Sequence, residues 1–544
     1  MVQLYPGFYA FNERHLPLIN APRSSSGGCI IIPVTFYFEK REGFVSNTSV
    51  LIIGTGMAGL SAGCYAQMNG YRSQIYEMHS QPGGLCTSWK RKGYTIDGCI
   101  HWLVGSSPKS SFYPFWQEVG VVQNRQFIDF DEYARFEGSD GRTLILYANP
   151  DRLEKHLIEL SPEDEAVIKE FTEGVRFCLK FDPPSETAPA LTRLAQILRY
   201  MLVLLPGMKK IRQYMNTTTK VFAERLKSPL LREAFLEMWF PEFSLFFMMF
   251  TFAYMKQKIA GYPIGGSMPM SKAVEQRYLK LGGQIHYNSR VTKIMVEGGK
   301  AVGIRLEDGS EVRADAVISA ADGHATIFDM LDGNYIDETI RGYYEKYTLF
   351  PPLIFVGLGV RRTFEDLPKS VSGFSFPLET PVEIGEKKRE RLPVHVFNHD
   401  PTLAPEGKTT LVVMLNSEYD YWKKLHEDPA AYEDKKEQIA QAIIEQLDRR
   451  FPGLAELVEM VDVATPITFE RYTGNWKGSF EGFLITPQNA MVRMKNTLPG
   501  LENFYMSGQW VMPGGGLPTA VQSARSTLQQ MCKKDGKKFT TSKP

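Results

Sequence analysis

The sequence predicts an α/β protein in which one domain, built on a parallel sheet, is assembled from separated parts of the chain. A β-branched strand at 49–53 leads through a glycine turn into a helix of small residues, the pattern of a parallel strand and its crossover helix. Alternating strands and glycine turns at 282–322 predict a β-meander. A glycine-rich turn at 513–516 again separates a strand from a helix. We therefore expect a discontinuous Rossmann-like domain with a β-meander, and an α+β cap formed by the intervening segments.

The composition is that of a globular protein. The chain has 544 residues, of which 43% are hydrophobic and 12% aromatic, so we expect roughly two to four domains' worth of structure. Its 62 Lys and Arg residues nearly balance 61 Asp and Glu residues, so no overall field favours a polyanion and nucleic-acid binding is not expected. The six cysteines form no C-x-x-C pair, which is typical of a reducing compartment and predicts a cytoplasmic protein.

Two stretches bear on contact with a membrane. The apolar segment 238–250 is interrupted by Pro241 and Glu242, which leaves fewer apolar residues than the about 20 that a spanning helix needs. At 197–212 apolar residues stand beside a basic cluster, which indicates either a helix that dips into an anionic membrane interface or a buried cap helix with a solvated end. We expect no spanning helix and keep peripheral membrane contact as a hypothesis.

The first glycine turn carries the strongest functional signal. Gly54 allows the tight turn, Gly56 lets the backbone approach a pyrophosphate, and Gly59 lets the helix pack against the strand. The N–H groups at the start of the helix, around Met57 and Ala58, would then face the phosphates.

A second strand at 73–77 ends in Glu77, where an acidic side chain can bind ribose hydroxyls. Strand, glycine turn, helix, strand and acidic residue follow in the order of a dinucleotide site, whereas glycines that only allow a turn would not explain Glu77. A Gly83-Gly84 pair follows six residues later and is succeeded by Leu85.

With these motifs the sequence resembles the flavoprotein superfamily of amine oxidases and phytoene desaturases. In that family a Glu followed by a Gly-Gly turn holds the ribose of FAD and passes its diphosphate, so the resemblance implies FAD as cofactor. No second G-x-G-x-x-G occurs, so a separate NAD(P) domain is not expected and the electron donor or acceptor stays unknown. The resemblance places further cofactor contacts in the meander and near the C-terminus, at Val291, Ala320, Gly508, Gln509, Gly516 and Leu517.

Residues 503–525 resemble the closing motif of the family, a strand, a glycine-rich turn and a helix whose N-terminus points at the flavin. Many relatives carry Asp after the Gly508 position, where it binds the ribityl chain. Gln509 stands there in this chain, and its amide can still hydrogen-bond.

Shorter motifs resemble the carotenoid isomerases and retinol saturases, namely 95–105, 399–407 and 464–482. Within the first of them His101 is the candidate catalytic residue, as an acid or a polar positioning group beside the flavin; the alternative is a structural histidine bonded to backbone. We interpret His399-Asp400 as a turn device, because Asp-Pro favours turn initiation. Neither a Ser/His/Asp set nor a metal-ligand spacing is present, so no metal is expected.

We divide the chain into seven parts. The FAD-binding domain comprises 48–110, 263–330 and 491–535, and the substrate-binding cap comprises 111–262 and 331–490. Residues 1–47 form an N-terminal extension and 536–544 a tail, and we expect the charged stretch 533–538 to be solvated.

These features predict an FAD-dependent oxidoreductase, either a desaturase, a saturase or an isomerase. It would act on a carotenoid, retinoid or other long apolar isoprenoid or lipid by hydride exchange with flavin N5. The Phe- and Met-rich stretch 238–255 would form the wall of such a site, or else ordinary cap core. The alternatives are an amine-oxidase-like flavoenzyme and a non-enzymatic prenyl-lipid escort protein resembling the GDP dissociation inhibitors, which share this fold without using flavin. The intact glycine set argues against the escort protein.

Overall fold

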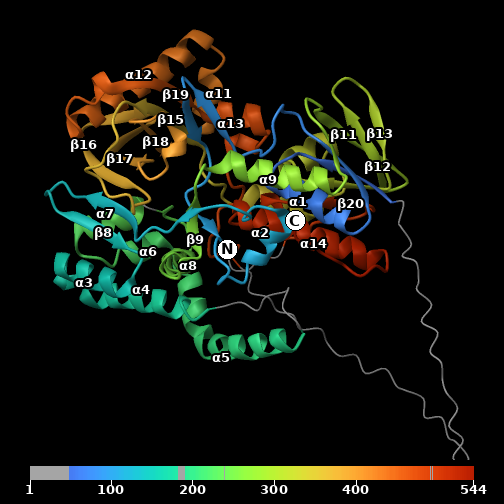
Figure 1. The fold of residues 1–544 in the computed structure, drawn as a ribbon, viewed down its shortest axis with the longest axis horizontal. Helices are drawn as coiled ribbons and strands as arrows, with labels where there is room; N and C mark the ends of the chain where they lie inside the picture. Colours follow the sequence, from blue (N-terminus) through green and yellow to red (C-terminus); the bar gives the residue numbers. More distant parts are fainter. Residues whose placement is uncertain (1–47, 182–189, 238, 491, 493) are drawn as a thin grey trace, which may run out of the picture.

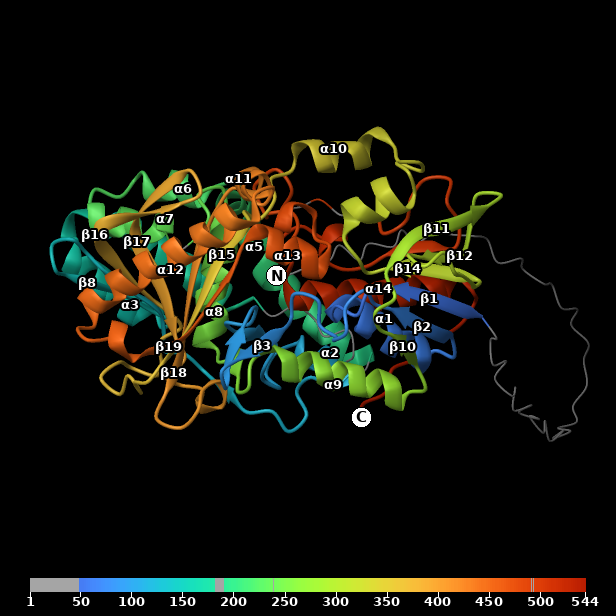
Figure 2. The same ribbon diagram turned by 90° about the horizontal axis from the view of Figure 1, so that it is seen from above.

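The computed structural model describes residues 48–181, 190–237, 239–490, 492 and 494–544. Two lobes lie side by side in Figure 2, the cap on the left and the nucleotide-binding lobe on the right. The predicted extension 1–47 lies outside the described residues. The mixed α/β architecture confirms the predicted fold class.

The nucleotide-binding lobe is built on a five-stranded sheet that joins distant parts of the chain, in the order β10-β2-β1-β14-β20. Its strands are all parallel: β1 (Ser49–Ile53), β2 (Arg72–Tyr76), β10 (Gln284–His286), β14 (Ala316–Ser319) and β20 (Phe504–Met506). Val50 and Ile52 pack into one core, and Leu51 and Ile53 pack into another on the opposite face. The sheet is therefore covered on both sides, as its apolar strands require.

One face of this sheet carries helices α1 (Met57–Met68), α9 (Ser267–Lys280) and α14 (Gly516–Lys534). The other face carries an antiparallel sheet of β11 (Val291–Glu297), β12 (Lys300–Leu306) and β13 (Glu311–Arg313), beside α10 (Glu338–Lys346) (Figure 2). The structure confirms the predicted meander, and after it the chain returns to the parallel sheet through β14.

Helix α2 (Tyr113–Val119) follows the predicted boundary at 110, yet it packs with the nucleotide-binding lobe. Glu118 on α2 accepts a hydrogen bond from Tyr65 Oη on α1 (2.9 Å) and forms an ion pair with Arg525 on α14 (3.2 Å). All three side chains are buried, so this polar cluster ties three helices of the lobe together.

The tail 536–544 in part packs against the same lobe. The ring of Phe539 lies 5.9 Å from that of Tyr65, and the backbone N–H of Thr540 donates to Asn69 Oδ1 (2.7 Å). The charged stretch 533–538 before it is largely exposed, as expected, and the ring of Phe539 anchors the residues that follow.

The cap is built on a seven-stranded mixed sheet in the order β19-β15-β18-β17-β16-β7-β8. The second insert supplies β15 (Leu353–Val360), β16 (Phe374–Ile384), β17 (Lys387–Val396), β18 (Thr409–Asn416) and β19 (Val458–Ala464). The first insert adds β7 (Glu132–Glu137) and β8 (Thr143–Tyr147), with β7 parallel to β16. Helices α11 (Tyr419–Leu425), α12 (Pro429–Arg450) and α13 (Pro466–Thr473) belong to this part.

Most of the rest of the first insert is helical. It comprises α3 (Pro150–Leu160), α4 (Glu165–Cys178), α5 (Ala190–Met215), α6 (Thr219–Ala223), α7 (Pro229–Glu237) and α8 (Leu245–Lys256). Short strands lie between the lobes: β3 (Ser88–Arg91), β4 (Tyr94–Asp97), β5 (Leu103–Val104), β6 (Phe127–Ile128) and β9 (Ala260–Pro263). Within the described residues, no helix is long and apolar enough to cross a membrane.

Candidate active site

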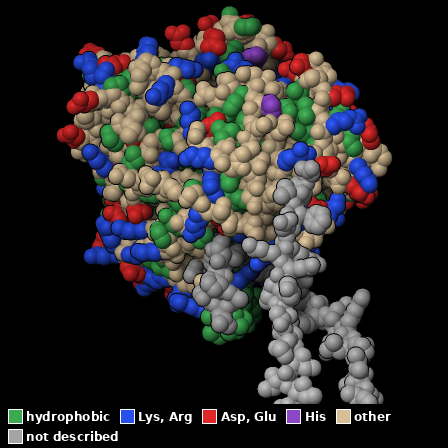
Figure 3. All heavy atoms as spheres, turned by 45° about the vertical axis from the view of Figure 1, so that its right-hand side comes forward, with side chains coloured by type: hydrophobic (Ala, Val, Ile, Leu, Met, Phe, Trp, Pro, Cys, Tyr) green, Lys and Arg blue, Asp and Glu red, His purple; other side chains and the backbone are tan. Residues whose placement is uncertain are grey.

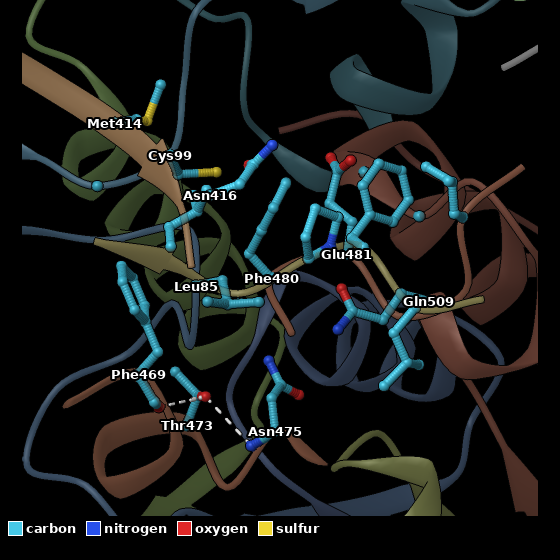
Figure 4. Close-up of a pocket in the computed structure, with 18 of the residues that line it drawn as sticks. Leu85, Cys99, Met414, Asn416, Phe469, Thr473, Asn475, Phe480, Glu481 and Gln509 are labelled. Atoms are coloured by element: carbon cyan, nitrogen blue, oxygen red, sulfur yellow. Dashed lines mark hydrogen bonds between the residues drawn. The ribbon is translucent and has the colours of Figure 1, made fainter. Parts of the chain in front are cut away.

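A cavity of about 2020 Å³ runs from the first glycine turn into the cap (Figure 4). Pockets for one small ligand typically measure about 300–1,000 Å³, so this cavity has room for two long ligands. All but one of the residues predicted to bind a cofactor line it: Gly54, Gly56, Met57, Ala58, Glu77, Gly83, Gly84, Leu85, Val291, Ala320, Gly508, Gln509, Gly516 and Leu517. Three segments that are far apart in sequence thus converge on one site.

The exception is Gly59, which packs against the turn instead. A Cβ atom there would lie 1.9 Å from the carbonyl oxygen of Gly54. This is the close contact between helix and strand that the sequence assigned to Gly59, so its role in a cofactor site is indirect.

Glu77 is held at the end of β2 by the first glycine turn. Its carboxylate accepts hydrogen bonds from the backbone N–H and the hydroxyl of Thr55, both at 2.7 Å, and from the N–H of His79 at 2.8 Å. The side chain is nearly buried and borders the cavity. Its position is therefore fixed before any ligand binds.

The second glycine turn lies directly against the first. Gly83 N–H donates to the carbonyl of Thr55 (2.9 Å), and a Cβ on Gly84 would lie only 3.3 Å from the Cα of Gly56. Gly84 also has a φ of +58°, a conformation that favours glycine. The two turns together form a wall of bare backbone, along which an extended ligand can lie.

His101 borders the cavity in a stacked pair with His395, with ring centroids 4.4 Å apart. Burial lowers the pKa of His101 well below its usual value, and the neighbouring His395 lowers it further. Burial also lowers the pKa of His395, whose Nδ1 lies 2.8 Å from the carbonyl of Ser372. The pair is thus neutral near pH 7. The alternative interpretation of His101 is a structural histidine bonded to backbone, and in this pair it is His395 that makes a backbone contact.

The loop before His101 is anchored by Asp97. This buried carboxylate accepts from the N–H groups of Cys99 and Ile100, both at 3.0 Å, and from Ser267 Oγ at 2.7 Å. Because Ser267 begins α9, Asp97 fixes the histidine loop to the nucleotide-binding lobe.

Glu481 is a cavity residue that the sequence analysis did not single out. Its side chain is partly buried in the cavity wall, and this burial raises the pKa of the carboxyl to about 7. In Figure 4 it lies with Gln509 on one side of the cavity, across from Cys99 and Met414. Glu481 lies within the stretch 464–482, but a single carboxylate in a loop has no periodic signal that could reveal it.

Asp322 is a second buried carboxyl in the cavity wall, and burial raises its pKa to about 7 as well. It accepts hydrogen bonds from the N–H groups of Ala325 (2.7 Å) and Trp476 (2.9 Å). Its oxygens are therefore engaged in holding two loops, unlike those of Glu481, which face the cavity.

The cap end of the cavity has an aromatic wall. From the Phe- and Met-rich stretch, Phe243, Phe247, Phe250 and Tyr254 face the cavity with helical spacing. Met248 and Met249 are fully buried in the cap core instead. One side of α8 therefore lines the cavity with aromatic rings, and the other side is ordinary cap core, so both interpretations of the stretch apply.

His399-Asp400 is a structural turn, in agreement with its interpretation. Asp400 accepts from the N–H of Thr402 (3.0 Å), from Tyr262 Oη (2.9 Å) and from the N–H of Gly265 (2.8 Å). It thus caps its own turn and joins the two inserts.

Residues 57–532 match the sequence model of the flavin-containing amine oxidoreductase family. The chain belongs to this family. This confirms the resemblance drawn from the glycine motifs, and it makes the protein a flavin oxidoreductase.

Curated relatives of this flavin oxidoreductase include two carotenoid enzymes. The chloroplastic prolycopene isomerase of Arabidopsis thaliana is 24% identical, over 93% of this chain and 86% of its own length. The neurosporene-forming phytoene desaturase of Cereibacter sphaeroides is 24% identical, over 87% of this chain and 92% of its own.

Solved structures share the fold of this flavin oxidoreductase. An oxidoreductase from Methanosarcina mazei has a TM-score of 0.54 at 18% identity, covering 88% of this chain and 100% of that one. Cyclohexylamine oxidase from Brevibacterium oxydans has a TM-score of 0.54 at 13% identity, covering 89% and 99%.

The cavity of this flavin oxidoreductase fits its cofactor. Helices α1 and α14 both begin at the cavity wall, after Gly56 and Gly515, and neither has a capping side chain among the described residues. The N–H groups of a first helical turn lack partners within the helix and attract anionic or electron-rich groups. Two such termini, at different places on one cavity, suit a long ligand with phosphates at one point and an electron-accepting ring at another.

Proposed function

We propose that the flavin is FAD and that the protein desaturates, saturates or isomerises a long apolar isoprenoid, such as a carotenoid or a retinoid. The observation that carries this proposal is one continuous cavity. Its one end is lined by the two glycine turns and its other end by the aromatic wall of the cap.

Three features of the cavity wall favour FAD over a mononucleotide. Glu77 stands where an adenosine ribose would bind, the paired glycine turns give a diphosphate room, and Gly516 at the start of α14 lies in a different part of the wall. Heat release of the cofactor followed by mass spectrometry tests this assignment. FAD is expected, and release of FMN alone would contradict it.

The bound flavin would supply hydride exchange with a substrate carbon. The side chains of the chain do the rest. Phe247, Phe250 and Tyr254 hold an apolar chain and exclude water, and the neutral His101–His395 pair offers a polar edge without placing a charge in the cavity. The Glu481 carboxyl, whose raised pKa lets it hold a proton near pH 7, can give that proton to a substrate carbon or take one from it.

An amine substrate is the second candidate, because solved amine oxidases share the fold. Those structures are only 13–15% identical, however, whereas the carotenoid enzymes are about 24% identical over most of both chains. A cavity whose carboxyls Glu481 and Asp322 are half protonated near pH 7 also attracts an ammonium group weakly. The membership in an oxidoreductase family favours an enzyme over an escort protein.

A substrate panel separates these candidates. The flavin-loaded protein, oxidised or reduced, is mixed without oxygen with carotenoids, retinoids, unsaturated fatty acids or amines. The proposal predicts a change in flavin absorbance or a new lipid product with the isoprenoids. A flavin that responds only to amines would support the second candidate, and a lipid panel that stays unchanged in both redox states would overturn the proposal.

A further inference from the structure

Helix α5 carries most of the exposed apolar surface in the described part of the chain. Ten large hydrophobic side chains are exposed there, and six of them belong to α5: Leu194, Ile197, Leu198, Leu202, Leu205 and Met208. Their exposed fractions run from 38% at Ile197 to 75% at Leu202. In Figure 1 α5 projects at the lower edge of the molecule, and Figure 3 shows hydrophobic side chains gathered at that edge.

These exposed side chains recur every three or four residues, so they lie on one side of the helix. The opposite side of α5 packs against the cap through Tyr200, Gly207, Ile211 and Tyr214, all of which are buried. At Gly207 the contact is close enough that a Cβ would lie 2.3 Å from the ring of Phe177. The packing of α5 in the cap therefore leaves its outer apolar side unexplained.

The charges on α5 are all of one sign. Its 26 residues include five basic side chains and no acidic one, although the whole chain is nearly neutral. The basic residues are Arg193, Arg199, Lys209, Lys210 and Arg212. An apolar stripe flanked by Lys and Arg is the pattern of a helix that lies in the interface of an anionic membrane.

The helix also lies next to the substrate end of the cavity. Its Tyr200 ring lies 5.0 Å from that of Phe181, and Phe181 lies 5.7 Å from Phe250, which lines the cavity. A bilayer that holds the outer side of α5 would thus lie close to the aromatic wall, where a lipid-soluble substrate has to arrive.

We propose that the outer side of α5 docks the protein on an anionic lipid surface, with the helix lying in the plane of the interface. The basic side chains contact lipid phosphates, while Leu198, Leu202 and Leu205 insert among the acyl chains. Docking of this kind needs no turnover, so it stands or falls separately from the proposed function.

Flotation of the flavin-loaded full chain with vesicles tests the docking. One set of vesicles contains phosphatidylcholine alone, and the other contains equal parts of phosphatidylcholine and phosphatidylglycerol. We expect the protein to float with the anionic vesicles at low salt. The double variant Leu202→Glu/Leu205→Glu should lose about ten-fold or more in vesicle binding, because two charges then replace inserted side chains.

Two further variants sharpen the result. Lys209→Glu/Lys210→Glu should lower binding to the anionic vesicles and abolish its salt dependence, whereas Leu279→Glu, at an exposed leucine on α9, should leave binding unchanged. The flavin absorbance of each variant reports that it is folded.

Three outcomes would overturn the proposal. In the first, the wild-type protein fails to float with anionic vesicles. In the second, Leu202→Glu/Leu205→Glu binds these vesicles as well as the wild type does. In the third, the wild-type protein forms an oligomer in vesicle-free solution and Leu202→Glu/Leu205→Glu dissociates it, which would show that a second copy of the chain covers α5.

Discussion

Glu77 and Thr55 join the acidic end of β2 to the first glycine turn through two hydrogen bonds of 2.7 Å, one from the Thr55 N–H and one from its hydroxyl. The residue that would bind ribose and the turn that would carry the diphosphate are thus a single rigid unit. A change at Glu77 should therefore disturb both parts of the cofactor site.

Replacing Glu77 with Gln should weaken flavin binding by about 10- to 100-fold, because hydrogen bonds to a charged group contribute about 1.5–3 kcal/mol. Titration of the apoprotein with FAD, followed by flavin fluorescence, gives the affinity. Glu502→Gln, at an exposed carboxylate, is the control and should bind flavin normally. An unchanged affinity in Glu77→Gln would argue that the ribose binds elsewhere.

Replacing either of two glycines of the first turn with Ala should impair a different property, flavin binding at Gly56 and stability at Gly59. At Gly56, where φ is −60°, no described atom would lie within 4 Å of an added Cβ, so Gly56→Ala should fold with a normal Tm and yet bind flavin poorly. At Gly59 the added Cβ would lie 1.9 Å from the Gly54 carbonyl oxygen, so Gly59→Ala should lose about 1–3 kcal/mol of stability or more. Thermal unfolding of the two apoproteins and flavin titration separate the effects. Equal loss of stability in both variants would contradict this assignment.

Much of the nucleotide-binding lobe could be predicted from sequence because its signals are local. The β1 strand, the glycine turn, α1 and Glu77 lie within one short segment. Each glycine there and Glu77 has a single physical role that its residue type reveals. The meander and α14 are recognised in the same way. These are the parts of the fold whose geometry is set by neighbours in the chain.

Other features depend on contacts between distant residues. His101 pairs with His395, which is almost 300 residues away, and the raised pKa of Glu481 comes from burial, which no local pattern reports. The periodicity at 197–212 predicted a helix and left two environments open, because a pattern does not state which side of a helix its neighbours cover. The structure shows that one side of α5 packs and the other is exposed.

The buried pair of Glu118 and Arg525 should be important for stability. Glu118→Gln removes the carboxylate charge that faces the buried guanidinium of Arg525, and breaking a buried ion pair typically costs about 3–5 kcal/mol. Urea unfolding of the flavin-loaded protein measures the loss. Glu159→Gln, which breaks the exposed pair with Lys155, should change the stability by less than about 0.5 kcal/mol. Similar losses in both variants would show that the buried pair contributes no more to the free energy of unfolding than the exposed pair does.

Glu481 should give the protein a distinctive dependence on pH. Its pKa is raised by burial from 4.5 to about 7, so the folded protein binds more protons than the unfolded chain between these values. Its stabilising contribution is therefore complete below pH 4.5 and is lost as the pH rises through 7. The difference in stability between wild type and Glu481→Gln should follow this window, because the other titrating groups are common to both proteins. A pH-independent difference would mean that the carboxyl is ionised normally.

The same substitution should affect the reaction. Proton transfer by a positioned side chain typically contributes 10²- to 10⁴-fold, so Glu481→Gln should lower turnover by about 100-fold or more while flavin binding is retained. The profile of turnover against pH should also lose its inflection near pH 7. A variant that keeps full turnover would assign the proton transfer to another group.

Anaerobic mixing of the flavin-loaded protein with one acyclic polyene shows whether the flavin and a long isoprenoid share the cavity. Flavin absorbance and chromatography of the extracted polyene are followed together, first with oxidised and then with reduced flavin. We expect a desaturated, saturated or isomerised polyene in at least one of the two redox states. An unaltered polyene in both states, together with flavin bleaching by a simple amine, would contradict it.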